Sequence, residues 1–207
     1  MSDVLILIPA AGASRRMQGR DKLLEQIDGE AILTRQTRRA LATGTDVLVT
    51  LSRDHPDRRA VLTPLDAAEL TLLTIDGSEG MAISFRTAAS YASDHDYTGV
   101  LVALPDMPDL GTGDLCHVLD TFRTDPTKVH RATSSDGRPG HPVVIPKRLF
   151  PRLAELRGDQ GARMALREET PRLIALPGVR ALIDLDTPQE WAAWRDGTGQ
   201  HAGNHKP

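Results

Sequence analysis

The sequence predicts an α/β fold built on a doubly wound, largely parallel sheet. Apolar runs of strand length alternate along the chain with segments whose apolar residues recur at helical spacing, which is the pattern of parallel sheets covered by helices. The clearest runs are VLILI near the N-terminus and GVLVAL at residues 99–104, and each leads into a short loop. At 207 residues the chain suits one domain with a substantial core, which we expect over residues 1–196.

Composition and charge exclude several classes of function. Hydrophobic residues make up 40% of the chain and charged residues 26%, as in an ordinary globular protein. A net charge of −3 and only 3% aromatic residues argue against binding to nucleic acid or an anionic membrane. The single cysteine, Cys116, excludes an internal disulfide and falls on an apolar helical face, where we expect it to pack. The first apolar run is five residues long without a charged leader, so we expect neither a signal peptide nor a membrane span and a cytoplasmic location.

The first strand and its loop carry the strongest functional signal. Val4 to Ile8 have the length and β-branched content of a buried strand, and the loop Pro9–Ser14 after it consists of small residues. Such a loop lets backbone N–H groups approach phosphate oxygens. Nearby bases add charge-assisted bonds; they are Arg15, Arg16, Arg20 and Lys22. The dinucleotide and Walker A fingerprints are both absent. The alternative is a plain strand–helix turn with a solvated basic patch.

The next elements continue the alternation of helix and strand. They are a helix over residues 30–43 that ends at Gly44, a strand over 46–51, a short helix within 52–69 and a strand over 70–75. Asp76–Gly80 then turns into a helix, with Ser78 as its candidate N-cap and free N–H groups in its first turn. An ordinary capped helix explains the same residues.

An aspartate follows the second clear strand directly. Proline on both sides, Pro105 and Pro108, ends the strand and stiffens the turn. Asp106 is therefore expected at the carboxyl edge of the sheet, where doubly wound folds bind their ligands. An aspartate in such a turn also serves commonly as a backbone cap.

The second half of the chain continues in the same way. We expect a helix over 112–123, strands over 128–133 and 142–145, an amphipathic segment over 149–156, and short strands over 172–176 and 181–183. Thr187, Pro188 and Glu190 form a capping box that opens a last helix. The polar, glycine-rich tail over 197–207 is expected to be mobile, with no metal role for its His201 and His205.

Two further loops contain residues with chemical potential. His141 follows Gly140 and is either an acid, base or phosphate ligand or a structural turn residue. Gly158–Arg163 places two glycines before a helix, which suits a second anion site or a simple helix–helix turn.

Six segments together resemble the molybdenum cofactor cytidylyltransferase family and its nucleotidyltransferase relatives. In this chain they are Ala10–Met17 with Asp21–Leu24 (A-A-G-x-S-x-R-M…D-K-L-L), Gly80–Ser84 (G-M-x-x-S), Leu104–Pro108 (L-P-D-M-P), Gly140–Val143 (G-H-P-V), Gly158–Arg163 (G-D-x-G-A-R) and Asp184–Pro188 (D-x-D-T-P). The segments span almost the whole chain.

The resemblance implies a three-layer α/β sandwich with a Rossmann-like, mostly parallel sheet of the nucleotide-diphospho-sugar transferase type. It also implies a magnesium-dependent enzyme that transfers CMP from CTP to the terminal phosphate of molybdopterin and releases pyrophosphate. The attacking phosphate is already ionised, so such an enzyme needs positioning and charge neutralisation rather than a general base. A molybdoenzyme or its maturation chaperone is the implied protein partner.

The resemblance also assigns roles to individual residues. Arg16, Lys22 and Asp106 are the candidate catalytic residues. The candidate nucleotide-binding residues are Ala10, Ala11, Gly12, Ser14, Arg16, Lys22, Ser78, Gly80 and Ser84, and the candidate acceptor-binding residues are Gly140, His141, Asp159 and Arg163. The candidate magnesium ligands are Asp106, Asp184 and Asp186. Asp184 is the first choice beside Asp106, because Asp186 can equally serve the turn before Thr187.

Three alternatives stay open. The GTP-using siblings of this family carry A-G-G where this chain has Ala10-Ala11-Gly12, and the larger side chain of Ala11 favours CTP. A sugar-phosphate nucleotidylyltransferase shares the loop and the metal aspartate. A non-catalytic accessory protein that delivers cofactor to a molybdoenzyme would bind nucleotide without releasing pyrophosphate.

Overall fold

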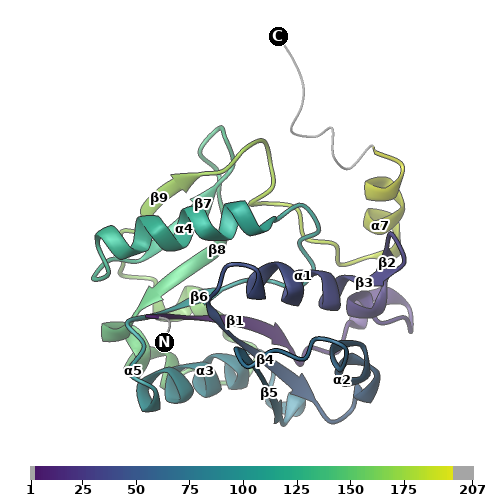
Figure 1. Ribbon diagram of the computed structural model, residues 1–207, viewed down its shortest axis with the longest axis horizontal. Coiled ribbons are helices and arrows are strands. Elements are labelled where there is room, and N and C mark those ends of the chain that lie inside the picture. Colours follow the sequence, from purple (N-terminus) through teal and green to yellow (C-terminus); the bar gives the residue numbers. More distant parts are fainter. Residues whose placement is uncertain (1–2, 198–207) are drawn as a thin grey trace.

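Strand β1 (Val4–Ala10) is an interior strand of the sheet (Figure 1). The computed structural model describes residues 3–197, and within that range the main sheet has seven strands in the order β5-β4-β1-β6-β8-β7-β9. β1 pairs in parallel with β4 (Asp46–Ser52) and β6 (Gly99–Val102), and β4 pairs in parallel with β5 (Leu70–Ile75). The carboxyl ends of these four strands therefore meet at one edge of the sheet.

At the other end of the sheet, parallel and antiparallel strand pairings are mixed. β8 (Pro139–Pro146) is antiparallel to β6 and to β7 (His130–Thr133), whereas β9 (Arg172–Ala175) is parallel to β7. Four of the six pairings in the described sheet are parallel, which confirms the predicted largely parallel α/β architecture.

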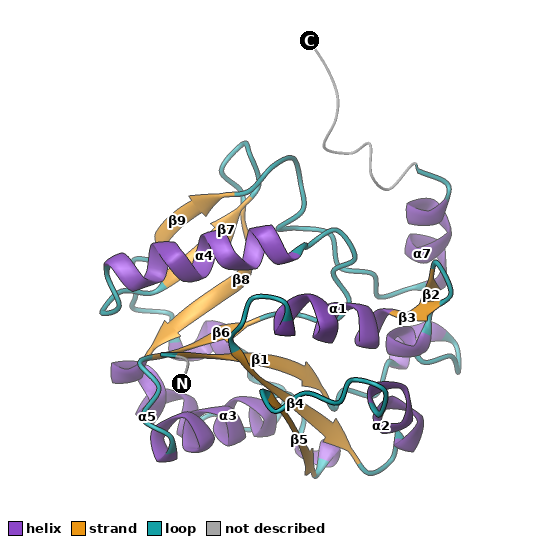
Figure 2. Ribbon diagram, in the orientation of Figure 1, coloured by secondary structure: helices purple, strands orange, loops and turns teal. Residues whose placement is uncertain are grey.

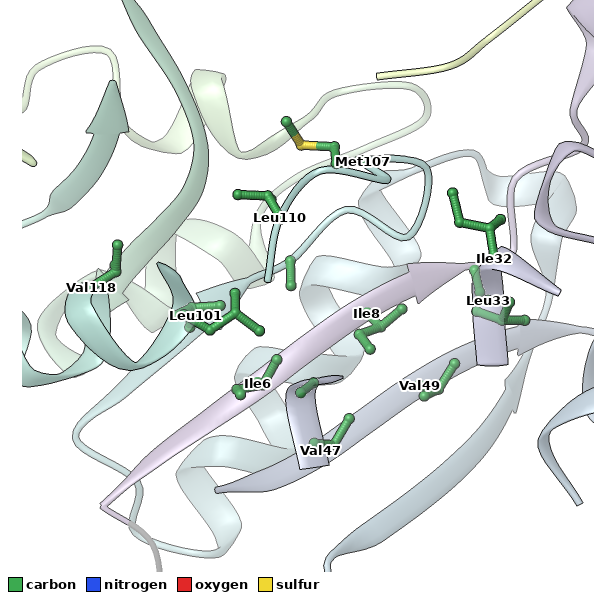
Figure 3. Packing of buried hydrophobic residues seen from close by; sticks show 14 of the residues in the cluster. Ile6, Ile8, Ile32, Leu33, Val47, Val49, Leu101, Met107, Leu110 and Val118 are labelled. Atoms are coloured by element: carbon green, nitrogen blue, oxygen red, sulfur yellow. The ribbon is translucent and has the colours of Figure 1, made fainter. Parts of the chain in front are cut away.

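Helices cover both faces of the sheet and make three layers (Figure 2). Alternate side chains of β1 point to opposite faces, with Ile6 and Ile8 in one core and Leu5 and Leu7 in the other. The first core also contains residues of α1 (Ile32–Leu41), α2 (Pro56–Leu62), α4 (Thr112–Thr124) and α7 (Pro188–Arg195), and Figure 3 shows part of this packing. The second core contains residues of α3 (Ala82–Asp94), α5 (Phe150–Ala154) and α6 (Ala162–Ala165). Because β1 is buried on both faces, its sequence is continuously apolar.

A small hairpin precedes α1. β2 (Gln26–Ile27) pairs with β3 (Glu30–Ala31), and the connecting Asp28 and Gly29 have φ values of 54° and 81°. Asp-Gly is the preferred sequence of such a tight turn, because both residues tolerate positive φ. The prediction of helix from residue 30 is wrong by two residues for this reason, and α1 begins at Ile32.

Two other sequence predictions are corrected by local hydrogen bonds. Ser78 is not an N-cap: its N–H donates to Asp76 Oδ1 over 3.0 Å, which forms the short 3-10 turn η3 (Gly77–Glu79), and α3 begins only at Ala82. The apolar run 181–183 is not a strand, because the Leu182 N–H donates to Val179 O over 2.8 Å and closes a turn.

The capping box of α7 is confirmed, since Thr187 and Glu190 exchange hydrogen bonds.

The remaining short elements lie beside the loops. Three further 3-10 turns are η1 (Arg15–Met17), η2 (Lys22–Leu24) and η4 (Lys147–Leu149). No helix within residues 3–197 combines the length and apolar character needed to cross a membrane. The tail predicted from Gly197 onward, including His201 and His205, lies outside the described residues except for Gly197 itself.

Candidate active site

A cavity of about 420 Å³ opens at the carboxyl edge of β1 and β6. Its walls come from segments far apart in the sequence: Pro9, Ala11 to Arg16, Lys22, Leu23, Gly77, Gly80, Met81, Ser84, Leu104 to Asp106, Asp159, Asp184 and Asp186. Binding crevices of open parallel sheets lie at this edge. A larger cavity of about 780 Å³, beyond the loop that carries Asp106, contains none of the predicted site residues.

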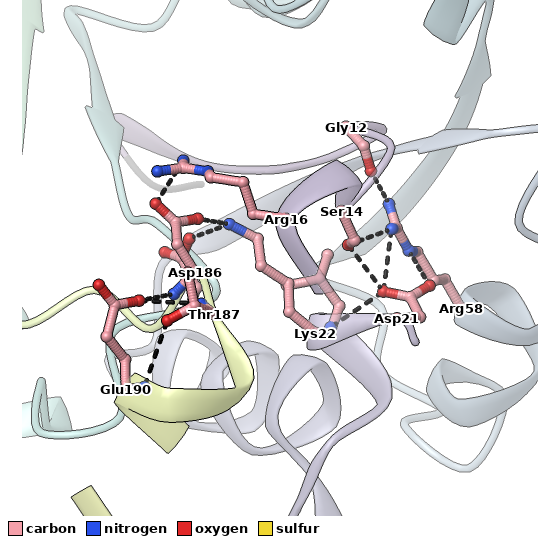
Figure 4. A network of polar contacts seen from close by, with 11 residues as sticks. Gly12, Ser14, Arg16, Asp21, Lys22, Arg58, Asp186, Thr187 and Glu190 are labelled. Atoms are coloured by element: carbon pink, nitrogen blue, oxygen red, sulfur yellow. Dashed lines mark hydrogen bonds and ion pairs between the residues drawn. The ribbon is translucent and has the colours of Figure 1, made fainter. Parts of the chain in front are cut away.

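The loop after β1 has a strained backbone that its neighbours hold in place. Ser14 has φ 48° and ψ 34°, the left-handed conformation that non-glycine residues rarely adopt. Its hydroxyl donates to Asp21 Oδ1 over 3.1 Å, and Arg58 Nη2 donates to the same hydroxyl over 3.0 Å (Figure 4). Gly12 and Ala13 are exposed and line the cavity.

Lys22 connects the loop to the aspartates on the far wall. Its Nζ lies 2.5 Å from Asp106 Oδ2 and 2.6 Å from Asp186 Oδ1. Arg16 Nη2 lies 2.5 Å from Asp186 Oδ2, although the Arg16 side chain is largely exposed. Burial alone would lower the pKa of Lys22, but the charges and hydrogen bonds of Asp106 and Asp186 raise it overall. The lysine therefore stays protonated at neutral pH.

The Asp184–Asp186 segment is fixed beside Asp106 by its backbone. The Leu185 N–H donates to Asp106 O over 3.0 Å. The Asp186 N–H donates to Glu190 Oε2 over 2.8 Å, so its backbone serves the turn before α7 while its side chain contacts Lys22 and Arg16. The turn role expected for Asp186 is therefore present, and its carboxylate is paired with Lys22 and Arg16. Asp184 follows a turn rather than the strand expected before it.

The three aspartates fit a divalent cation in charge, and Asp106 also has unused acceptor capacity. Burial raises the pKa of Asp184, and the negative charges of Asp106 and Asp186 raise it further. Asp106 Oδ1 is buried, and no hydrogen-bond donor within residues 3–197 reaches it. The described residues contain no preformed cluster of three or more His, Cys, Asp or Glu ligands. Magnesium suits such a partial site, because it keeps several waters and takes phosphate oxygens from its substrate.

Side chains of α1 hold the loop that carries Asp106. Gln36 is buried and its Nε2 donates to Met107 O over 2.6 Å, while Arg39 Nη1 donates to Pro108 O and Leu110 O over 2.7 Å each. Neither residue was identified as functional from the sequence. One feature of the sequence could have indicated the role of Gln36. It is a polar residue three positions after Leu33, on the apolar face of α1.

Gly80, Ser84 and Asp159 together form another wall of the cavity. Gly80 has φ 73°, and a Cβ atom there would lie 2.5 Å from Asp159 Oδ1 and 2.6 Å from Gly158 O. The position therefore requires glycine for the close approach of the Asp159 loop, which is also held by the Ala82 N–H donating to Gly158 O over 3.0 Å. Ser84 is buried, and its hydroxyl accepts from Thr50 Oγ1 over 3.0 Å.

Five predicted residues do not line this cavity: Ala10, Ser78, Gly140, His141 and Arg163. Burial and then the charge of Arg131 lower the pKa of His141 to about 4 despite the opposing effect of Asp106, so its ring is neutral at pH 7. Gly140 is needed for packing, since a Cβ atom there would lie 1.8 Å from Ala181 O. The His141 N–H donates to the same carbonyl over 2.8 Å.

The fold and this site define a nucleotidyltransferase. The loop after β1, Lys22 and Asp106 lie in one crevice, and nucleotidyl transfer requires phosphates to be positioned and their charge neutralised. The chain belongs to the family of the MobA-like NTP transferase domain, whose model matches residues 6–173.

Two curated relatives match most of the chain. The purine catabolism protein PucB of Bacillus subtilis is 27% identical over 191 residues, which cover 88% of this chain and 91% of the relative. A probable molybdenum cofactor guanylyltransferase of Rhodopirellula baltica is 25% identical over 192 residues, which cover 90% and 89%.

Solved structures have the same fold. Rv0371c of Mycobacterium tuberculosis superposes with a TM-score of 0.77 at 23% identity, covering 94% of this chain and 96% of that one. The manganese complex of Rv0371c gives a TM-score of 0.72 at 22% identity, covering 94% and 97%. A CMP:2-keto-3-deoxy-manno-octonic acid synthetase complexed with CTP superposes with a TM-score of 0.75 at 14% identity. The match covers 97% of this chain and 100% of that one.

Proposed function

We propose that this enzyme transfers CMP from CTP to the terminal phosphate of molybdopterin. In the reaction, an acceptor phosphate oxygen forms a bond to the α-phosphorus of the nucleotide. The bond from that phosphorus to the bridging oxygen breaks, and pyrophosphate leaves. The observation that carries the proposal is the meeting of the phosphate-facing loop, Lys22 and the three aspartates Asp106, Asp184 and Asp186 in one cavity.

The residues of the cavity suit the two ends of the nucleotide. Backbone N–H groups around Gly12 would bind the β- and γ-phosphates, and Arg16 and Lys22 would offset the charge that develops on pyrophosphate. Gly80, Met81 and Ser84 on the opposite wall leave room for the nucleoside. Because the attacking phosphate is ionised, the neutral and half-buried His141 is not required as a base.

Magnesium is the proposed metal, held by Asp106 together with Asp184 or Asp186. When bound, it neutralises charge on the phosphate oxygens at the reacting phosphorus. Lys22 then keeps its contact with a carboxylate or exchanges it for a phosphate oxygen, because its ammonium group is a mobile point charge.

Nucleotide and acceptor identity are the finer parts of the proposal. Ala11 is 6% exposed and lines the cavity. Its methyl group, where the GTP-using siblings carry glycine, would narrow the space for a purine and favour a pyrimidine. The guanylyltransferase relative supports GTP as the second candidate and the molybdenum cofactor as the acceptor, with a molybdoenzyme or its chaperone as the recipient of the product.

A pyrophosphate assay tests the proposal. The protein is incubated with magnesium, molybdopterin and each of the four NTPs in turn. We expect release with CTP that depends on both metal and acceptor. Faster release with GTP would favour the guanylyl alternative, and release with a sugar 1-phosphate in place of molybdopterin would identify the sugar-nucleotide class. Nucleotide binding without any release would indicate an accessory protein.

A further inference from the structure

Arg58 is a fully buried arginine whose side chain points out of its own helix into the loop after β1. It lies in the middle of α2 and has 0% relative exposure. Its guanidinium makes five hydrogen bonds within the described chain: Nε to Asp21 Oδ2 at 2.7 Å, Nη1 to Ala10 O and Gly12 O at 2.7 Å each, and Nη2 to Ser14 Oγ at 3.0 Å and Asp21 Oδ1 at 2.9 Å. Sequence analysis assigned no function to it.

The acceptors of these bonds all belong to one functional segment. They lie within residues 10–21, which run from the end of β1 through the loop to the residue before Lys22. One acceptor, Ala10 O, belongs to the last residue of β1, and the other four lie in the loop beyond it. The side chain of the next residue bonds to the sheet instead: Arg59 Nη2 donates to Thr74 Oγ1 of β5 over 3.0 Å. Arg58 therefore holds the loop (Figure 4).

The contacts explain how the loop keeps its unfavourable backbone. A serine in the left-handed region is strained, and such strain persists only where surrounding groups fix it. The Ser14 hydroxyl lies between Arg58 and Asp21 and is hydrogen-bonded to both. The Asp21 carboxylate also accepts the Leu23 N–H over 3.0 Å, which orients the turn that carries Lys22.

Only a guanidinium matches this set of acceptors. Arginine presents five donors in a rigid planar fork, whereas lysine has a single ammonium group. Burying the charge is costly unless it is paired and its donors are satisfied. Asp21 supplies the paired charge: burial alone would raise the pKa of Asp21, but the bonds and charge of Arg58 lower it overall.

We propose that Arg58 is a positioning residue of the nucleotidyl transfer site. It fixes the loop in the form that receives the triphosphate and sets Lys22 against Asp106 and Asp186. It does not touch the substrate, and it acts through Gly12, Ser14 and Asp21. This role in catalysis rests on the proposed function.

The test compares Arg58→Lys with the matched control Arg59→Lys in the full chain. Amide hydrogen exchange on the ligand-free proteins is expected to rise about tenfold or more in residues 12–24 of Arg58→Lys, because the loop opens locally. Exchange in β4 and β6 should stay unchanged, and Arg59→Lys should resemble wild type throughout. Arg58→Lys should also weaken the binding of inorganic tripolyphosphate, measured by calorimetry.

Turnover then separates positioning from folding. With wild-type melting behaviour, Arg58→Lys is expected to lose roughly ten- to a hundredfold in kcat/KM for the nucleotide, while KM for the acceptor stays the same. Methylguanidinium at millimolar concentration should restore part of the activity of Arg58→Ala, and methylammonium should not.

The outcomes distinguish this proposal from the proposed function. If wild type releases no pyrophosphate with any NTP, the proposed function fails, and the exchange and tripolyphosphate data still decide whether Arg58 holds the loop. If wild type is active, unchanged exchange and binding in Arg58→Lys overturn the proposal. If amide hydrogen exchange in Arg58→Lys rises equally in the loop and in β4, the positioning role of Arg58 is also overturned, because Arg58 would then only stabilise the fold.

Discussion

Lys22 and Asp106 are 84 positions apart in the sequence, and their charged groups lie 2.5 Å apart at the carboxyl edge of the sheet. The same ammonium group contacts Asp186, so one lysine joins three of the segments that form the site. A lysine and the carboxylates that would hold a metal thus lie in direct contact. A nucleotide–metal complex can replace these contacts, since it brings both the negative charge for Lys22 and the positive charge for the aspartates.

Replacing Lys22 by alanine is expected to lower kcat/KM by roughly ten- to a thousandfold, the scale of losing one charge-assisted contact in the transition state. Arg16→Ala should act in the same range, because Arg16 also borders the cavity. Arg20→Ala is the matched control. Its guanidinium pairs with Glu25 over 3.2 Å and does not line the cavity, so a much smaller effect is expected. Equal losses in all three variants would mean a diffuse basic patch.

Asp106→Asn is expected to reduce activity on the order of a hundredfold or more, because the change keeps size but removes the charge of the proposed metal ligand. The fold should survive, since the Asp106 carbonyl still accepts the Leu185 N–H. Turnover across a magnesium titration, together with thermal melts, is the measurement. Asp109→Asn serves as a control, because Asp109 lies nearby but accepts from Trp194 Nε1 instead. Near-full activity of Asp106→Asn would eliminate this metal site.

Comparing Asp184→Asn with Asp186→Asn identifies the second metal ligand. If Asp184 holds the metal, Asp184→Asn should raise the magnesium concentration required for half-maximal activity. Asp186→Asn should then have its main effect through Lys22 and Arg16, which lose a charged partner, and should change nucleotide KM more than the magnesium requirement. The reverse pattern would assign the metal to Asp186.

The Asp21–Arg58 pair predicts a pH-dependent contribution to stability. The pKa of Asp21 is lowered in the folded state by Arg58 in spite of burial, from an ordinary value of 3.8. A depressed carboxyl pKa stabilises the fold fully above the unfolded value, and this stabilisation disappears as the pH falls through the folded value. The difference in unfolding free energy between wild type and Asp21→Asn should therefore be constant near neutral pH and shrink below about pH 4.

Chemical denaturation at a series of pH values measures that difference. His55 Nδ1 lies 3.8 Å from Asp21 Oδ2, so the series is repeated in a His55→Gln background to isolate Asp21. A difference that grows on acidification would contradict the assignment.

Local patterns made much of this fold predictable. β1, β4, β5 and β6 are short, apolar and bounded by turn residues, and all were predicted within three residues of their ends. The position of Asp106 at the sheet edge follows from the strand before it. The predicted N-cap failed because Asp76, two residues before Ser78, forms the competing turn. The strand predicted over residues 181–183 is absent, because a run of three apolar residues indicates burial without specifying a strand partner.

Long-range contacts account for what the sequence did not reveal. Arg58 stands next to Arg59, and nothing in their neighbourhood distinguishes a buried arginine from an exposed one. Its acceptors lie 37 to 48 positions away. Gln36 likewise reaches a carbonyl 71 positions away. Such residues are identified only when the tertiary structure shows which backbone groups need donors.

Nucleotide choice is tested most directly at Ala11. Ala11 lines the cavity and is 6% exposed. Ala11→Gly removes one methyl group from this wall and should make more room for a purine. A methylene-sized change in a pocket alters discrimination by roughly ten- to two-hundredfold, so the ratio of kcat/KM for CTP to that for GTP should fall by about tenfold. Ala13→Gly adds the same backbone freedom to the exposed part of the loop and should leave the ratio unchanged. If wild type already turns over both nucleotides equally, or if both variants shift the ratio alike, Ala11 does not select the base.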